Sequence, residues 1–368
     1  MGHVLSGFWR DLKFGMRLIR VLRLFSDLDP RSHDTITQDI EGTVDRSPEA
    51  IAFFFEGRTF TYRNIDQRAN RVAQWALGQN LRRGDCVALN LENCPDFVIV
   101  WYGLSKVGVI CALINTNLKD EGLEHCIRIV DAKAVISAGL QAERSLSCLK
   151  ARRSPVDVWD FDGANGRDFE AALAGQKEVR PSATHRQGIR SGDTALYIYT
   201  SGTTGLPKAA RITHNKLRGT GRIAKALVQI KRTDRVYNAL PLYHITGGGI
   251  GLIGPLSVGA SVILKRRFSA GEFWQDIAEN RATLFVYIGE LCRYLVNAAP
   301  HPSETSHCVR AGFGNGLRAE VWRSFVDRFG VPTMRELYGS TEGNVSFLNL
   351  DGTVGAIGQM PPWIGKRI

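Results

Sequence analysis

The sequence lacks the cysteine patterns that build a disulfide framework or a structural zinc site. It contains seven cysteines, and no two of them are spaced as Cys-x-x-Cys. No secretory signal opens the chain, so we expect reduced thiols in a cytosolic protein. No neighbouring motif marks any of these cysteines as a nucleophile.

Several other signatures are also missing. The chain has no Gly-x4-Gly-Lys-Ser/Thr phosphate loop, no zinc-finger spacing, no aromatic-rich RNA-binding run and no internal repeat. Its formal net charge of +11 would suit nucleic acid, an anionic membrane surface or an anionic substrate such as ATP. Because these signatures are missing, we do not predict a nucleic-acid partner. The membrane surface and an anionic substrate remain candidates, and the alternative is a basic surface with no specific partner.

The composition and patterning indicate an α/β protein. Of the 368 residues, 44% are hydrophobic and 23% are charged, which is ordinary for a globular domain. Predicted strands at 52–55, 59–62, 87–90, 110–114 and 132–137 alternate with helical patterns. This alternation predicts a mainly parallel sheet. The more polar stretch 141–190 predicts a surface connection or a seam between two subdomains.

The first 25 residues have the pattern of a basic amphipathic helix. Apolar residues recur at spacings of one, three and four, and basic residues lie between them. Because charges repeatedly interrupt the apolar run, neither a membrane span nor a signal peptide is predicted. The helix would lie on anionic lipid at the membrane surface or dock on the protein's own surface. We assign 1–30 to this segment and 31–368 to a separate domain.

The most informative stretch is 197–208, which reads Tyr-Ile-Tyr-Thr-Ser-Gly-Thr-Thr-Gly-Leu-Pro-Lys. Residues 196–199 predict a buried strand. The six residues that follow it contain four hydroxyls and two glycines, which suit a loop that wraps an anion. Lys208 adds a positive charge, and Pro207 restricts its approach. An ordinary surface turn is the alternative, which the flanking strand and lysine disfavour.

Three further segments carry residues suited to nucleotide chemistry. In residues 237–249 a predicted strand is followed by Pro-Leu-Tyr-His and then by a predicted triple-glycine turn. Residues 309–318 contain a predicted Gly-x-Gly-x-Gly turn. Residues 336–343 read Glu-Leu-Tyr-Gly-Ser-Thr-Glu-Gly. In this last segment the tyrosine can stack on adenine, the threonine can bond a phosphate, and the second glutamate can hold Mg²⁺. A lone histidine is usually structural, and a glycine turn alone is usually a loop.

Taken in order, these motifs resemble those of the adenylate-forming enzymes, the acyl-CoA synthetase superfamily. Residues 287–294 and 309–318 resemble the fatty-acid-transport-protein and very-long-chain acyl-CoA synthetase branch. The resemblance extends from about residue 35 to the end of the chain. It implies the fold of the large N-terminal, AMP-binding domain of these enzymes, with stacked, mainly parallel sheets and flanking helices.

The resemblance also implies the roles of particular residues. Thr341 and Glu342 would be catalytic, with Glu342 as the Mg²⁺ ligand. Three residues would line the substrate pocket: His244, Gly247 and Gly248. The expected nucleotide-binding residues are Thr200, Ser201, Gly202, Thr203, Thr204, Gly205, Lys208, Gly314, Asn315, Gly316 and Tyr338.

The implied activity is ATP-dependent conversion of long- or very-long-chain fatty acids to acyl-CoA through an acyl-adenylate, with coenzyme A as co-substrate. The alternatives are a non-catalytic fatty-acid-binding or uptake protein and a synthetase for bile-acid-like carboxylates. Family members continue to a ribose-binding aspartate, a hinge and a mobile C-terminal domain that carries a lysine. We find none of these before Ile368. We therefore expect the fold to be incomplete at the C-terminus and this chain alone to bind nucleotide weakly and turn over slowly.

Overall fold

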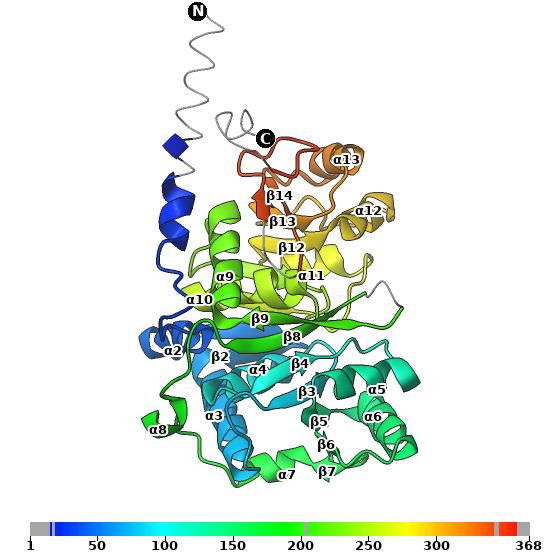
Figure 1. Ribbon diagram of the computed structural model, residues 1–368. Coiled ribbons are helices and arrows are strands. Elements are labelled where there is room, and N and C mark those ends of the chain that lie inside the picture. Colours follow the sequence, from blue (N-terminus) through cyan, green and yellow to red (C-terminus); the bar gives the residue numbers. More distant parts are fainter. Residues whose placement is uncertain (1–14, 17–18, 202–204, 342–345, 359–368) are drawn as a thin grey trace, which may run out of the picture.

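The computed structural model describes residues 15–16, 19–201, 205–341 and 346–358. These residues form two stacked β-sheets with helices packed between and around them (Figure 1). The hydrophobic core is divided accordingly into one cluster that joins the sheets and two clusters on their other sides. The predicted α/β architecture is therefore confirmed.

The first sheet has eight strands in the described part of the chain. Neighbouring strands within it run parallel, except for the antiparallel pair at each edge. Its spatial order is β15 (Ser346–Leu348), β14 (Met334–Gly339), β13 (Ala311–Asn315), β12 (Leu284–Ile288), β10 (Arg235–Asn238), β11 (Ser261–Leu264), β1 (Ile51–Phe55) and β2 (Arg58–Thr61).

The second sheet has seven strands among the described residues. All of its neighbouring pairs are parallel except the last, β8 with β9. Its spatial order is β7 (Arg167–Asp168), β6 (Asp157–Asp160), β5 (Ala132–Ser137), β3 (Cys86–Asn90), β4 (Ile110–Leu113), β8 (Thr194–Thr200) and β9 (Lys208–Thr213). The polar stretch 141–190 contributes strands β6 and β7 to one edge of this sheet.

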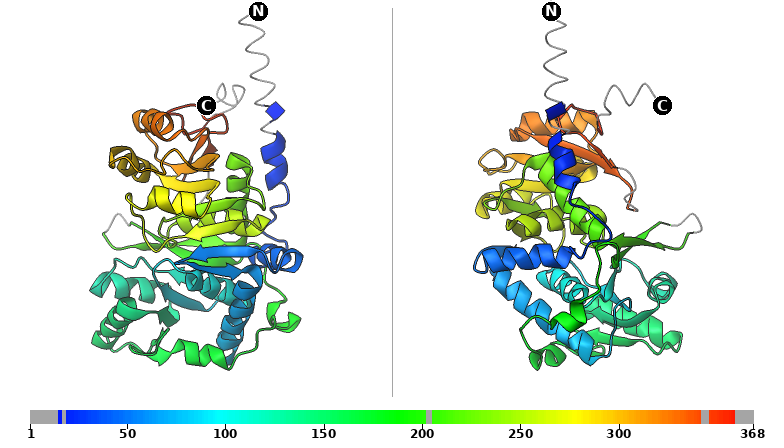
Figure 2. Two further views of the ribbon diagram at one scale, coloured as in Figure 1. Left: turned by 180° about the vertical axis from the view of Figure 1, so that it is seen from behind. Right: turned by 60° about the vertical axis from the view of Figure 1, so that its left-hand side comes forward.

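Helices fill the space between the sheets and cover their remaining faces (Figure 2). The helices with several residues in the central cluster are α2 (Ile36–Arg46), α3 (Tyr62–Gly78), α4 (Pro95–Lys106), α7 (Phe169–Ala174) and α10 (Gly251–Val258). Those that pack on the first sheet are α9 (His214–Val228), α11 (Phe273–Glu279), α12 (Gly289–Asn297) and α13 (Ala319–Phe329). The other α-helices of the described ranges are α5 (Asp120–Ile129), α6 (Gly139–Ala151) and α8 (Ala183–Arg186).

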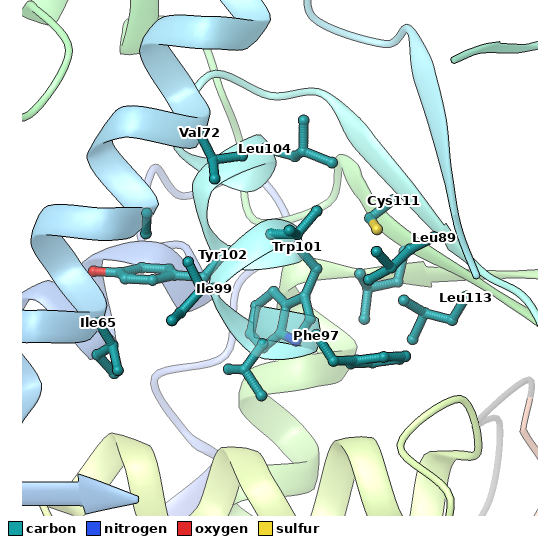
Figure 3. Close-up of a cluster of buried hydrophobic side chains, with 14 of the residues drawn as sticks. Ile65, Val72, Leu89, Phe97, Ile99, Trp101, Tyr102, Leu104, Cys111 and Leu113 are labelled. Carbon is teal, nitrogen blue, oxygen red and sulfur yellow. The ribbon is translucent and has the colours of Figure 1, made fainter. Parts of the chain in front are cut away.

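Helices α3 and α4 pack closely at the centre of the molecule (Figure 3). A Cβ atom on Gly103 of α4 would lie only 2.5 Å from the carbonyl oxygen of Ala69 in α3, so only glycine permits this approach. Around the contact, Trp101 and Phe97 are almost completely buried. Burying an aromatic side chain of this size is worth a few kcal/mol, so this helix pair anchors both sheets.

A buried ion cluster joins three of these helices. The side chain of Lys106 at the end of α4 is fully buried, and its Nζ lies 2.8 Å from Glu41 of α2 and 2.6 Å from Asp66 of α3. Tyr102 donates a further hydrogen bond of 2.6 Å to Asp66. Opposite charges of this kind compensate each other inside a protein only while all partners are present.

Several local predictions are confirmed. The predicted hairpin is formed by β1 and β2, and the Thr61 hydroxyl then caps α3 by accepting a hydrogen bond of 3.1 Å from the Asn64 N–H. The predicted triple-glycine turn is wrong, because its residues belong to η1 (Ile245–Ile250), a π-helix. The reason lies in backbone packing, which is described below.

Most of the predicted N-terminal amphipathic segment lies outside the described residues. Residues 19–25 are helical and run beside α9 (Figure 1). Their exposed apolar side chains include Ile19 and Leu22, at 54% and 61% exposure. Within the described ranges, no helix combines the length and the apolar character needed to cross a bilayer.

Candidate active site

A cavity of about 530 Å³ lies beside the ends of β13 and β14. These strands are parallel neighbours, so their carboxyl ends meet at one edge of the sheet, where ligands of α/β proteins commonly bind. The cavity has a size typical of small-molecule sites, about 300–1,000 Å³. Its polar lining residues include Asn215, Lys216, Thr246, Asn315, Tyr338, Ser340 and Thr341.

Glycines near the ends of β12 and β13 allow close backbone contact between these strands and between the residues that follow them. A Cβ on Gly289 would lie 1.8 Å from the carbonyl oxygen of Gly316, and one on Gly314 would lie 1.9 Å from that of Tyr287. Gly316 also has a φ of +81°, which favours glycine. Gly314 is buried in the sheet, whereas Asn315 and Gly316 line the cavity. The predicted Gly-x-Gly-x-Gly turn is therefore mostly strand β13, and only its end, at Asn315 and Gly316, borders the cavity.

The amide of Asn315 is held by the neighbouring π-helix. The Thr246 hydroxyl lies 3.0 Å from the Asn315 side-chain oxygen and donates a hydrogen bond to it. This contact orients the amide at the cavity wall before any ligand arrives. Preorientation of this kind lowers the entropic cost of binding.

Glu336 holds the backbone that follows Gly316, and sequence reasoning did not identify this role. Its side chain is 2% exposed, and Oε2 accepts a hydrogen bond of 2.7 Å from the Leu317 N–H. Oε1 is buried without a partner among the described atoms. Burial raises the pKa of Glu336 to about 7, although backbone N–H groups of Leu317 and Gly316 oppose the shift. Its position at the start of a motif was visible in the sequence, but its burial was not.

Tyr338 and Thr341 reach the cavity from β14 and the residues after it. The Tyr338 side chain is 57% exposed, an unusual state for a large aromatic residue in a strand, and it lines the cavity. A planar base stacked on this ring would cover apolar area that is now in water. Thr341 is half-buried at the same wall, where its hydroxyl suits a phosphate oxygen.

The predicted metal ligand Glu342 lies outside the described residues. Within the described ranges, no group of three or more His, Cys, Asp or Glu side chains is arranged to hold a metal ion. The assignment of Mg²⁺ to Glu342 therefore stays a prediction from the motif.

The predicted phosphate loop lies at the tip of the β8–β9 hairpin. The predicted strand is confirmed as part of β8, and Thr200 at its end pairs with Lys208 at the start of β9. Ser201, Gly205 and Lys208 are exposed, and Gly205 has a φ of +88°. The remaining loop residues of the prediction, Gly202, Thr203 and Thr204, lie outside the described residues. None of the described loop residues belongs to the lining of the 530 Å³ cavity.

The three predicted substrate-pocket residues lie at the start of the π-helix. Cβ atoms on Gly247 and Gly248 would lie 2.5 Å and 2.0 Å from backbone carbonyl oxygens of Pro241 and Leu242, respectively. These buried glycines therefore allow the π-helix to pack against the chain that precedes it. His244 is exposed, with its ring centroid 4.6 Å from that of Tyr243. From this segment, the cavity is lined by residues Ile245, Thr246 and Ile250.

The other wall of the cavity combines apolar side chains with the polar residues Asn215, Lys216 and Thr220 of α9, and sequence reasoning did not place it there. It includes side chains from β9, α9 and the N-terminal segment: Ile212, Ile223, Phe25 and Leu28. Gly219 of α9 also lines this wall. The helical spacing of apolar residues predicts a buried face for α9, but spacing alone does not show that part of the face borders a cavity.

The two stacked sheets, with a nucleotide-suited cavity at the strand ends, define an adenylate-forming domain. The chain belongs to the AMP-binding enzyme family, whose model matches residues 40–368. The resemblance inferred from the motifs is thus confirmed. At the sequence level, the mouse long-chain fatty acid transport protein 6 is 37% identical over 364 residues, covering 96% of this chain and 58% of that protein. The human long-chain fatty acid transport protein 3 is 40% identical over 301 residues, covering 78% of this chain and 43% of that protein.

Solved structures agree with the fold. An anthranilate CoA ligase in complex with anthranoyl-AMP matches with a TM-score of 0.80 at 22% identity, covering 91% of this chain and 64% of that one. The N-terminal domain of FACL13 from Mycobacterium tuberculosis matches with a TM-score of 0.78 at 19% identity, covering 89% and 82%. The predicted fold of an adenylate-forming N-terminal domain is confirmed by these matches.

Proposed function

We propose that this chain forms the nucleotide- and acyl-binding part of a ligase that activates long-chain fatty acids with ATP. The observation that carries the proposal is one cavity whose lining combines Tyr338 and Thr341 with apolar side chains such as Ile223. A fatty acyl-adenylate likewise combines a polar nucleotide half with an apolar acyl half. Membership of the AMP-binding enzyme family supports the nucleotide half, and the names of the transport-protein relatives support the fatty acid.

The proposed reaction has two steps. A carboxylate oxygen of the fatty acid attacks the α-phosphorus of ATP, and pyrophosphate leaves with the electron pair of the broken P–O bond. The thiolate of coenzyme A then attacks the acyl carbonyl carbon, and AMP leaves. Both steps depend on holding the reacting atoms in line and on stabilising negative charge at the phosphate.

The residues at the polar wall suit the first step. The Tyr338 ring would stack on adenine, and the Asn315 amide would bond the edge of the base. The Thr341 hydroxyl would donate to an oxygen of the α-phosphate. From the β8–β9 hairpin, outside the lining of this cavity, Lys208 would approach the leaving pyrophosphate and neutralise its charge. The two walls together would hold the carboxylate close to the α-phosphorus.

We further propose that the N-terminal segment contacts an anionic membrane surface. In its described part, the apolar side chains of Met16, Ile19 and Leu22 are 57%, 54% and 61% exposed, and basic Arg20 and Arg23 lie among them. Exposed apolar and basic groups on one helix favour the lipid interface. Sedimentation with anionic liposomes should fall on the double change Ile19→Glu and Leu22→Glu, and unchanged sedimentation would contradict the proposal.

Binding of non-hydrolysable acyl-sulfamoyl adenosines, measured by calorimetry, tests the main proposal without requiring turnover. We expect these analogues to bind more tightly than AMP, and Tyr338→Ala to weaken both about tenfold, since base stacking is worth about 1–3 kcal/mol. Tyr294→Ala is the matched control, because Tyr294 is similarly exposed at 51% but does not line the cavity.

Three outcomes separate the candidate functions. Equal affinity of the unmodified chain and Tyr338→Ala for every analogue would refute the adenylate site. Binding of free fatty acid without any binding of AMP would favour a non-catalytic fatty-acid-binding protein. ATP–pyrophosphate exchange with a panel of fatty, aromatic and bile-acid-like carboxylates would identify the preferred acid.

A further inference from the structure

The N-terminal segment forms one end of the cavity described above. Phe25 and Leu28 lie outside residues 40–368, which match the family model, and yet both line the cavity. We propose that these two side chains close the acyl end of the cavity and set the length of the acyl chain it accepts. This inference rests on the proposed function, because it needs an acyl-adenylate at the polar wall.

The turn that carries the two side chains is fixed to α9. Asp27 lies between them in sequence, and its carboxylate is 2.6 Å from Arg222 and 3.4 Å from Arg218. Arg218 is only 4% exposed and also pairs with Asp39 of α2 at 2.9 Å. A backbone hydrogen bond of 3.2 Å from the Leu28 N–H to the Phe25 carbonyl closes the turn. These contacts give the N-terminal wall a defined position against the helix.

The facing wall of α9 has a gap where a side chain is missing. A Cβ added to Gly219 would meet only the Leu28 Cδ1 atom, at 3.8 Å, which is an ordinary van der Waals contact. Gly219 lies inside a helix, where glycine is otherwise unfavourable. Its absent side chain leaves the cavity open beside Leu28, and Phe25 and Ile223 line the same cavity.

The direction of the acyl chain follows from the two walls. The Thr341 hydroxyl and the Tyr338 ring fix the phosphate and base at the β14 end, so the acyl chain must extend away from them toward α9. Its distal methylenes would lie in the cavity beside Gly219 and Leu28, near Phe25. Each methylene that the space admits adds about fourfold in affinity, which is the equivalent of about 0.8 kcal/mol for burying a CH₂ group.

Two substitutions change this space in opposite directions. Gly219→Leu fills the gap and also replaces glycine with a better helix former, so the variant should stay folded. We expect it to lose at least tenfold in affinity for an acyl-sulfamoyl adenosine of sixteen carbons, with no change for AMP or a four-carbon analogue. Phe25→Ala enlarges the cavity, and we expect its preferred chain length to increase.

The experiment is calorimetric titration of the unmodified chain and both variants with analogues of four to twenty-two carbons. Gly78→Leu and Leu22→Ala are the controls, since a Cβ on Gly78 meets nothing within 4 Å and Leu22 is 61% exposed. An unchanged chain-length profile in both Gly219→Leu and Phe25→Ala, with tight binding retained, would overturn this inference alone. Failure of the unmodified chain to bind any analogue would overturn the proposed function together with it.

Discussion

Protonation of Glu336 should control the stability of the protein near neutral pH. Burial raises the pKa of this carboxyl from 4.5 to about 7, so between these values the folded protein keeps a proton that the unfolded chain releases. The stabilising contribution is fully present below pH 4.5, decreases as pH rises toward 7, and is lost above it. The difference between the two pKa values corresponds to at most roughly 3 kcal/mol.

Glu336→Gln isolates this contribution. The amide oxygen can still accept the hydrogen bond from the Leu317 N–H, but the side chain no longer ionises. Urea unfolding of both proteins at pH 5, 6, 7 and 8 gives the difference in the free energy of unfolding, from which the other titrating groups largely cancel. We expect the variant to gain stability relative to the unmodified chain by roughly 2–3 kcal/mol between pH 5 and 8.

Parallel stability curves for the two proteins would refute the reasoning. A carbon-13 NMR titration of the Glu336 carboxyl is the independent check, because it follows protonation of the folded state alone. A midpoint near pH 4.5 would show that the backbone hydrogen bonds to Glu336 fully offset the effect of burial on its pKa.

Three further predictions concern the site and the core. Thr246→Val removes the hydrogen bond to Asn315. It should weaken binding of the acyl-sulfamoyl adenosines about fivefold, because a net hydrogen bond is worth about 0.5–1.5 kcal/mol. Unchanged affinity in calorimetry would contradict this prediction. Lys106→Met removes the buried cation that Glu41 and Asp66 share and leaves them only their ion pairs with Arg180 and Arg186. It should lower the free energy of urea unfolding by about 3 kcal/mol; a loss below about 1 kcal/mol would argue against the buried ion cluster. Gly248→Ala puts a Cβ 2.0 Å from a carbonyl oxygen and should lower the free energy of urea unfolding by about 1–3 kcal/mol. The control is Gly271→Ala, whose Cβ meets nothing within 4 Å and which should be nearly neutral. Equal effects of the two substitutions would contradict the packing argument.

Local rules explain which parts of the structure could be predicted from the sequence. The strand before the hydroxyl-rich loop, the hairpin of β1 and β2 and the cap at Thr61 each depend on residues only a few positions apart. The site residues Asn315, Tyr338 and Thr341 were found because their motifs are long and resemble those of a known family. The cavity that joins them follows from the parallel pairing of β13 with β14. The sequence pattern predicts a mainly parallel sheet but not which strands are neighbours.

The π-helix depends on a close backbone contact that residue composition does not reveal. The run at 245–249 was predicted as a turn, since three consecutive glycines usually break a helix. The carbonyl oxygens of Pro241 and Leu242 lie so close to Gly247 and Gly248 that only glycines allow the π-helix to form against them.

The same distinction applies to the two walls of the cavity. The polar wall is built from short motifs, so its residues can be recognised one by one. The apolar wall brings Phe25 next to α9, nearly two hundred positions along the chain, through the ion pairs of Asp27 with Arg218 and Arg222. No spacing rule links an N-terminal aspartate to those arginines. The part of the site that we propose to bind nucleotide is therefore predictable from the sequence, whereas the part that we propose to measure the acyl chain is visible only in the folded protein.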